Sequence, residues 1–193
     1  MAALFRPRLM NVIPTEISGV IIIEPQVFGD TRGFFFESYS EERYKEVTNT
    51  TFVQDNISQS SYGVLRGLHF QNSPYAQAKL IEVLQGQILD IAVDLRPDSE
   101  TYGKHIAVEL NDYTHRQLFI PKGLAHGFVA LSDKVTLHYK CDEYYHPEAE
   151  GGIIWNDETL NIKWPIPERD IILSEKDLKH PSFIEYERQH HYL

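Results

Sequence analysis

The stretch KLIEVLQGQILDIAVDL, residues 79–95, contains two apolar runs that meet at a Gln-Gly-Gln turn at 85–87. In the second run, every other residue from Leu89 to Leu95 is apolar, and Asp90 and Asp94 take the opposite face. An alternation of period two is typical of a β-strand with one buried face, and a glycine between two such runs indicates a hairpin turn. The stretch therefore predicts two antiparallel strands that bury the apolar face and turn the aspartates away from the core.

The same pattern recurs along most of the chain. Further short runs rich in β-branched and aromatic residues, separated by Gly, Pro, Asn and Asp, lie at 19–25, 33–39, 51–58, 64–71, 104–110, 116–121, 126–131 and 135–141. Helical patterns are sparse, and only two short helices are expected, one after Ser40 and one after Ser174. The sequence therefore predicts an all-β protein, a jelly-roll barrel or β-sandwich with a few short helices and a ligand site at the barrel mouth. The segment 144–165 lacks periodicity and is expected to form a loop over one end of the barrel.

Composition narrows the class of protein. The 193 residues suit a single domain spanning 1–193, with 42% hydrophobic and 24% charged residues. A net charge of −10 argues against a nucleic-acid partner, since such proteins usually carry a basic face. The single cysteine, Cys141, excludes an intramolecular disulfide and predicts a reduced, cytoplasmic protein. No apolar run approaches the roughly 20 residues that span a membrane, so no membrane association is expected.

The segment VLRGLHFQ, residues 64–71, places Arg66, Gly67 and His69 inside an apparent strand. Positions three apart on a regular strand face opposite sides of a sheet. Glycine permits a bulge or a close backbone approach, so Gly67 predicts an irregularity that lets Arg66 and His69 converge on one site. The alternative is a hydrogen-bonded core histidine beside a surface arginine.

Other strands supply polar residues for the same site. In the run 135–141, Tyr139 shares a face with Val135 and Leu137, which predicts that it points into the barrel. A buried tyrosine needs a partner for its hydroxyl, so Tyr139 is either a candidate acid or a core residue bonded to the backbone. His126 and Lys79 begin strands, and strand ends lie at a barrel mouth.

A catalytic metal is not expected. Metal-binding barrels of this type commonly use a His-x-His pair with a later Glu and His, and this chain contains no His-x-His. An alternative metal set of His69, His126 and Glu82 stays open at this point.

Several blocks together resemble one family. GVIIIEPQVFGDTRGFFFESY, FVQDNIS, VLRGLHFQ, QGQILDIAVDLR, FIPKGLAHGF, YKCDEYYHPEAEGGIIWND and LSEKD follow one another as in the dTDP-4-dehydrorhamnose 3,5-epimerases, from about Val20 to about Pro181. The resemblance implies a cupin-type jelly roll that inverts C3 and C5 of a dTDP-linked 4-keto-6-deoxyhexose. It also implies a reaction without cofactor or metal, and a homodimer that exchanges N-terminal strands.

The resemblance also implies roles for particular residues. His69 would be the base, Asp177 its partner, Tyr139 the proton donor on the opposite face, and Lys79 the cation at the enolate oxygen. The substrate-binding positions implied by the family are Phe28, Arg32, Glu37, Gln54, Asn56, Arg66, His126, Tyr145, Glu150 and Lys176. Among these, Tyr145 would stack on thymine, and Phe28 would reach the nucleotide of the neighbouring subunit.

Four alternatives remain at this level. The chain could epimerise a single carbon, or it could be a ketoisomerase acting on a related sugar nucleotide. From other classes, it could be a metal-dependent cupin oxygenase or a non-catalytic sugar-binding jelly roll.

Overall fold

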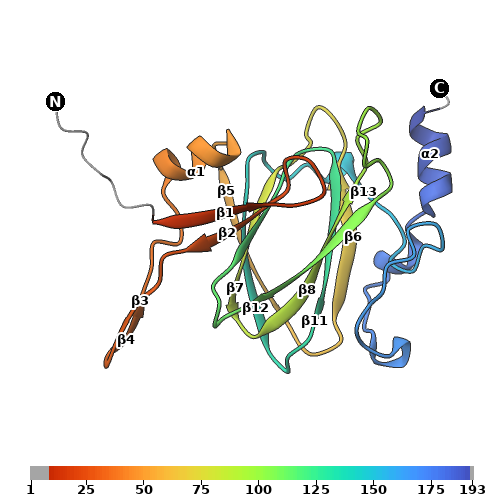
Figure 1. Ribbon diagram of the computed structural model, residues 1–193. Helices are drawn as coiled ribbons and strands as arrows, with labels where there is room; N and C mark the ends of the chain where they lie inside the picture. Colours follow the sequence, from red (N-terminus) through yellow and green to blue (C-terminus); the bar gives the residue numbers. More distant parts are fainter. Residues whose placement is uncertain (1–8, 192–193) are drawn as a thin grey trace.

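The computed structural model describes residues 9–191, which form two facing antiparallel sheets (Figure 1). The six-stranded sheet has the order β1 (Met10–Pro14), β2 (Ile21–Pro25), β10 (Gln117–Ile120), β7 (Lys79–Gln85), β12 (Val135–Cys141) and β5 (Gln54–Ser60). The five-stranded sheet has the order β13 (Glu150–Gly152), β6 (Leu65–Gln71), β11 (Leu124–Ala130), β8 (Gln87–Asp94) and β9 (His105–Asn111). The predicted jelly-roll fold class is confirmed.

The main core lies between the two sheets. Its buried residues come from both, such as Ile81 and Leu137 from the six-stranded sheet and Ile88, Leu110 and Phe128 from the five-stranded sheet. The inward alternation predicted for 135–141 is confirmed, because Val135 and Leu137 belong to this core and Tyr139 packs against it.

The hairpin predicted at 85–87 is wrong. β7 pairs with β10 and β12, whereas β8 pairs with β11 and β9, so the turn carries the chain from one sheet to the other. Gly86 adopts φ +85°, and a Cβ built there would lie 2.3 Å from the carbonyl oxygen of Lys134. Only glycine fits this tight crossing, so the glycine was read correctly as a turn residue but not as a hairpin.

The predicted orientation of the strand 87–94 is also wrong. Asp90 and Asp94 are fully buried, and Ile88 and Ala92, which share their face, belong to the core between the sheets. Ile91 and Val93 lie on the outer face of the five-stranded sheet, where the C-terminal segment 153–186 covers them. Both faces of this sheet are therefore buried. The segment 144–165 accordingly contributes β13 and a cover over the sheet, and not simply a loop at the barrel end.

The helices lie outside the barrel. α1 (Glu41–Thr48) follows Ser40 as predicted, and its buried Tyr44 packs on the six-stranded sheet and donates a hydrogen bond to Gln117 Oε1 at 2.7 Å. The helix expected after Ser174 is only the 3₁₀ turn η3 (Asp177–Lys179). α2 (Phe183–His191) was not predicted. Two further 3₁₀ turns are η1 (Pro147–Ala149) and η2 (Glu168–Asp170). None of the helices in residues 9–191 has the length and apolar character needed to cross a membrane.

A small hairpin stands apart from the barrel. Its strands are β3 (Phe28–Asp30) and β4 (Gly33–Phe35), which pair only with each other. Figure 1 shows the hairpin extending away from both sheets. Phe28, Phe34 and Phe35 are 51%, 63% and 69% exposed, so this hairpin presents apolar surface to solvent in the single chain.

Candidate active site

The irregularity predicted at Gly67 is confirmed. β6 pairs with β11 at His69↔His126 and Arg66↔Phe128, and the register shifts between these pairs. Gly67 has φ +137°, and a Cβ there would lie 2.5 Å from Cα of Gly127. The bulge turns Arg66 and His69, three positions apart, toward one cavity.

This cavity has a volume of about 370 Å³ and opens between the sheets. Of the predicted site residues, those that line it are Arg66, His69, Lys79, His126, Tyr139, Lys176 and Asp177. An adjoining cavity of about 320 Å³ shares His69, Lys79 and Tyr139 and adds Gln54, Asn56, Tyr145 and Glu150. Strands distant in sequence therefore bring most of the predicted site together.

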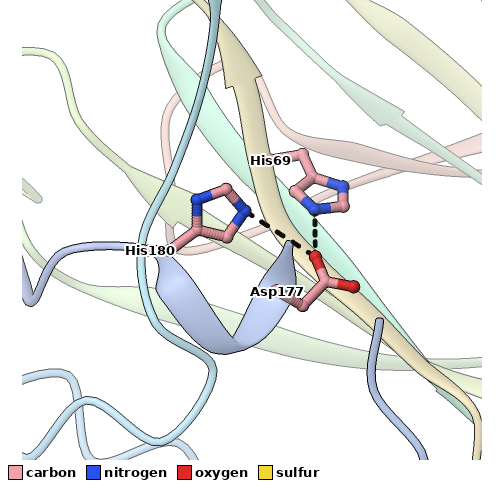
Figure 2. A group of neighbouring side chains, drawn as sticks. All are labelled: His69, Asp177 and His180. Atoms are coloured by element: carbon pink, nitrogen blue, oxygen red, sulfur yellow. Dashed lines mark hydrogen bonds and ion pairs between the residues drawn. The ribbon is translucent and has the colours of Figure 1, made fainter. Parts of the chain in front are cut away.

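His69 pairs with a carboxylate from the C-terminal segment. Its Nε2 lies 2.5 Å from Oδ1 of Asp177 (Figure 2). Ser174 Oγ donates to Asp177 Oδ2 at 2.8 Å. Burial alone would raise the pKa of Asp177, but the hydrogen bonds from His69 and Ser174 outweigh it and hold that pKa below its ordinary value. An ionised carboxylate accepts the Nε2–H, which leaves the Nδ1 lone pair of His69 able to take a proton.

Tyr139 reaches the cavity from the other sheet. It lies on β12 of the six-stranded sheet, whereas His69 lies on β6 of the five-stranded sheet. Burial raises the pKa of Tyr139, with a smaller contribution from Cys141. The phenol therefore stays protonated at neutral pH and is able to donate a proton.

Lys79 lies among buried polar groups. Burial lowers its pKa, and Cys141, Asp90 and Glu150 oppose that shift. Asp90, which sequence reasoning placed on the outward face, accepts a hydrogen bond from Nε2 of His126 at 3.0 Å, and burial raises its pKa. Asp90 was not predicted as a site residue. The feature that could have indicated it is an aspartate at the centre of a strand whose two faces are both buried. Burial therefore disfavours the charged form of Lys79, and the neighbouring acidic groups favour it.

Polar contacts order the second cavity. Tyr145 donates its hydroxyl to Glu150 Oε2 at 2.7 Å, and Lys176 forms an ion pair with the same carboxylate. Gln54 Nε2 donates to Asn56 Oδ1 at 3.0 Å, and Gln54 Oε1 accepts the backbone N–H of Tyr145 at 3.0 Å. These residues join the cavity wall to the 144–150 segment.

Three predicted binding residues do not reach the cavity of their own chain. Phe28 and Arg32 lie on the projecting hairpin, where Arg32 pairs with Asp30 and its side chain is 88% exposed. Glu37 follows the hairpin and pairs with Arg43 of α1. Their predicted contacts with ligand stay predictions.

The alternative metal set is not assembled. Glu82 faces the outer side of the six-stranded sheet, where its Oε2 lies 3.8 Å from Nδ1 of His138, away from His69 and His126. Within the described residues, the group of potential ligands that does come together is His69, Asp177 and His180 (Figure 2).

The chain is a cupin-type jelly roll whose polar cavity is lined by the His69–Asp177 pair and, from the other sheet, by the phenol of Tyr139. A family model described as dTDP-4-dehydrorhamnose 3,5-epimerase matches residues 14–185. The protein of that name from Escherichia coli is 52% identical over 170 residues, which are 87% of this chain and 91% of the relative.

Solved structures agree. The dTDP-4-dehydrorhamnose 3,5-epimerase of Elizabethkingia anophelis is 50% identical with a TM-score of 0.88, over 92% of this chain and 98% of the other. A dTDP-6-deoxy-D-glucose-3,5-epimerase of Legionella pneumophila, solved with dTDP-4-keto-L-rhamnose, is 48% identical with a TM-score of 0.86, over 90% and 92%. The chain belongs to the dTDP-4-dehydrorhamnose 3,5-epimerase family, whose members are isomerases. The resemblance read from the sequence is confirmed.

Proposed function

We propose that the chain converts dTDP-4-dehydro-6-deoxy-D-glucose to dTDP-4-dehydro-L-rhamnose by inverting C3 and C5, a step of dTDP-L-rhamnose synthesis. The observation that carries this proposal is the placement of His69 and Tyr139 on facing sheets around one cavity. Inversion needs a proton removed from one face of a carbon and returned to the other, and this arrangement supplies a base and an acid on opposite sides.

The first half of the reaction belongs to the five-stranded sheet. Nδ1 of His69 takes the proton from a carbon next to the C4 ketone, and the electron pair moves onto the ketone oxygen to give an enolate. Asp177 stabilises the imidazolium that forms, because it accepts Nε2–H as a carboxylate. Lys79 places its ammonium at the enolate oxygen, where charge develops.

The second half belongs to the six-stranded sheet. Tyr139 gives its proton to the carbon from the opposite face, the carbonyl reforms, and the carbon is inverted. The raised pKa of Tyr139 keeps the phenol protonated until this step. The imidazolium of His69 then releases its proton to solvent, and the phenolate of Tyr139 takes a proton from solvent, which restores both groups. Repeating the sequence at the second carbon gives the product, and none of these steps needs a cofactor.

The nucleotide portion of the substrate fits the remaining residues of the two cavities. Arg66 and Lys176 supply positive charge for a diphosphate, and the arginine fork can bond two oxygens at once. His126 adds a contact near the sugar, and Gln54, Asn56 and Glu150 add contacts in the adjoining cavity. Tyr145 is half-exposed and offers a ring face to thymine, which is worth about 1–3 kcal/mol by analogy with stacking in single-strand binding proteins.

We propose further that each single-domain chain works as half of a homodimer in the cytoplasm. The exposed phenylalanines of the β3–β4 hairpin support this, since they present apolar surface without a cover in one chain. In the dimer, Phe28, Arg32 and Glu37 would complete the cavity of the second copy. The acidic chain with its single cysteine, Cys141, fits a reducing compartment.

Proton NMR of the dTDP-keto sugar in deuterated water tests the function. The proposal expects solvent deuterium at both C3 and C5, with the L-rhamno product. Exchange at one carbon alone would support a single-carbon epimerase, and a shifted ketone would support a ketoisomerase. No turnover would support a binding protein, and iron-dependent, chelator-sensitive turnover would support an oxygenase; each of these results would contradict the proposal.

A further inference from the structure

A second imidazole lies beside the His69–Asp177 pair. His180 follows η3, and its Nε2 lies 3.7 Å from Asp177 Oδ1, the oxygen that His69 also contacts. The two imidazole rings have centroids 5.4 Å apart with planes at 69°. The side chain of His180 is only 10% exposed, and its Nε2 has no hydrogen-bond partner. Figure 2 shows this nitrogen pointing toward the carboxylate.

The neighbouring contacts fix these groups in place. The ring of His180 packs against Gly152, where a Cβ would come within 2.5 Å of ring atoms. Ser174 Oγ holds Asp177 Oδ2, so Oδ1 faces both imidazoles. Hydrogen bonds that orient a ligand in this way are typical of outer-sphere partners in metal sites.

We propose that His69, Asp177 and His180 form an inhibitory site for Zn²⁺ or a similar divalent transition metal. Two imidazoles and one carboxylate, with an open position, form a ligand set that zinc uses. The three ligand atoms already lie within 4.8 Å of one another. Tetrahedral bonds of about 2.0–2.2 Å place ligand atoms roughly 3.4 Å apart, so the His69–Asp177 contact opens by about an ångström and His180 closes in. The fourth position faces the cavity, which His69 and Asp177 line.

Zinc at this site inactivates the base, an effect that rests on the proposed role of His69. With the metal on Nε2, a neutral imidazole carries its proton on Nδ1. The lone pair that would accept the substrate proton is then absent. Zinc therefore inhibits this enzyme, whereas the metal of a metal-dependent cupin supports turnover.

The test compares the chelator-stripped wild type with His180→Leu, which removes the ligand without enlarging the side chain much. His180→Asn, which is smaller than the ring and free of conflict with Gly152, is the second variant if H180L folds poorly. His146→Leu is the matched control, because His146 lies 3.0 Å from Glu148 in a surface pair that could bind metal adventitiously.

Equilibrium dialysis with Zn²⁺ should give one ion per wild-type chain, with epimerase activity falling in proportion and returning with EDTA. Co²⁺ should show the visible bands of tetrahedral coordination. H180L and H180N should bind at least about 100-fold more weakly, since even outer-sphere partners are worth 10- to 100-fold, and H146L should match wild type.

Equal binding by wild type and H180L, zinc bound without inhibition, or activation by zinc would overturn the proposal. So would failure of the active wild type to bind zinc, and that result would leave the proposed epimerase function intact. If the chain lacks epimerase activity, dialysis and the Co²⁺ spectrum still decide the metal site.

Discussion

Replacing Asp177 by asparagine removes the negative charge that faces His69 while keeping the shape of the side chain. The Asn carbonyl can still accept Nε2–H, because the hydroxyl of Ser174, now 2.8 Å from Asp177 Oδ2, can accept the new amide N–H. What is lost is the charge that stabilises the imidazolium formed on proton abstraction. Hydrogen bonds to charged groups contribute about 1.5–3 kcal/mol, so kcat/KM should fall about 10- to 150-fold, at 1.36 kcal/mol per tenfold.

The assay is the rate of deuterium incorporation at C3 and C5, followed by proton NMR, for wild type and Asp177→Asn. Asp157→Asn is the matched control. Asp157 is also a buried aspartate, and its oxygens accept the backbone N–H groups of Leu160 and Phe183 at 2.8 and 2.7 Å, outside the cavity. D157N should lose stability but keep kcat/KM. A D177N enzyme with at least half the wild-type rate would refute the role of Asp177.

The same substitution has a pH signature in stability. Because the folded-state pKa of Asp177 lies below its ordinary value of 3.8, the carboxylate stabilises the fold above that value. This contribution disappears as the pH falls through the folded-state pKa. The difference in unfolding free energy between wild type and D177N, from urea titrations, should therefore shrink as the pH falls below 3.8. A difference that grows in acid would contradict the assignment.

Three further changes have distinct outcomes. Gly67→Ala should cost about 2–6 kcal/mol of unfolding free energy in urea, from backbone strain plus overlap with Gly127. Gly33→Ala is the control, because Gly33 has φ +135° but nothing lies within 4 Å of a Cβ built there, so it should show the strain alone. Equal losses for the two variants would contradict the overlap with Gly127. Tyr139→Phe should slow inversion about 10²- to 10⁴-fold while NMR still shows solvent deuterium entering with retention; parallel loss of exchange and inversion would argue against separate faces. Lys79→Met should lower kcat about 10²- to 10³-fold and abolish the basic limb of the pH–rate profile. In wild type the pKa of that limb should lie below the ordinary lysine value of 10.5, because burial lowers the pKa of Lys79. A limb that Lys79→Met leaves unchanged would belong to another group.

The sequence predicted elements well where only one face of a strand is apolar. Along 135–141 the inward residues are Val135, Leu137 and Tyr139, and local alternation is enough to orient them. Along 87–94 the same rule failed, because the apolar Ile91 and Val93 lie under the C-terminal segment while Asp90 lies inside. Alternation identifies two faces but does not tell which one meets the barrel interior when both are covered.

Features that depend on residues far apart in the sequence could not be predicted from local sequence patterns. The turn at Gly86 looks the same whether it joins paired strands or crosses between sheets. α2 offers only Phe183 and Tyr186 as buried apolar residues, too few for a clear helical stripe. The pairing of His69 with Asp177, 108 positions away, came from family resemblance, since no periodicity links residues so far apart. The bulge was the exception, because Gly67 between two polar residues marked it directly.

Asp177 lies on the segment that covers the outside of the barrel. Activity can therefore be lost under conditions in which most of the fold persists. Residues 153–186 hold to the five-stranded sheet through side-chain packing at positions such as Trp155 and Phe183 and through a few backbone hydrogen bonds, such as those between Ile153 and Leu68. Segments attached in this way can detach at lower free energy than the whole molecule. Detachment would carry the carboxylate away from an otherwise intact barrel, so thermal inactivation should precede loss of β-structure. Hydrogen exchange should find the amides of this cover opening before those of the central strands.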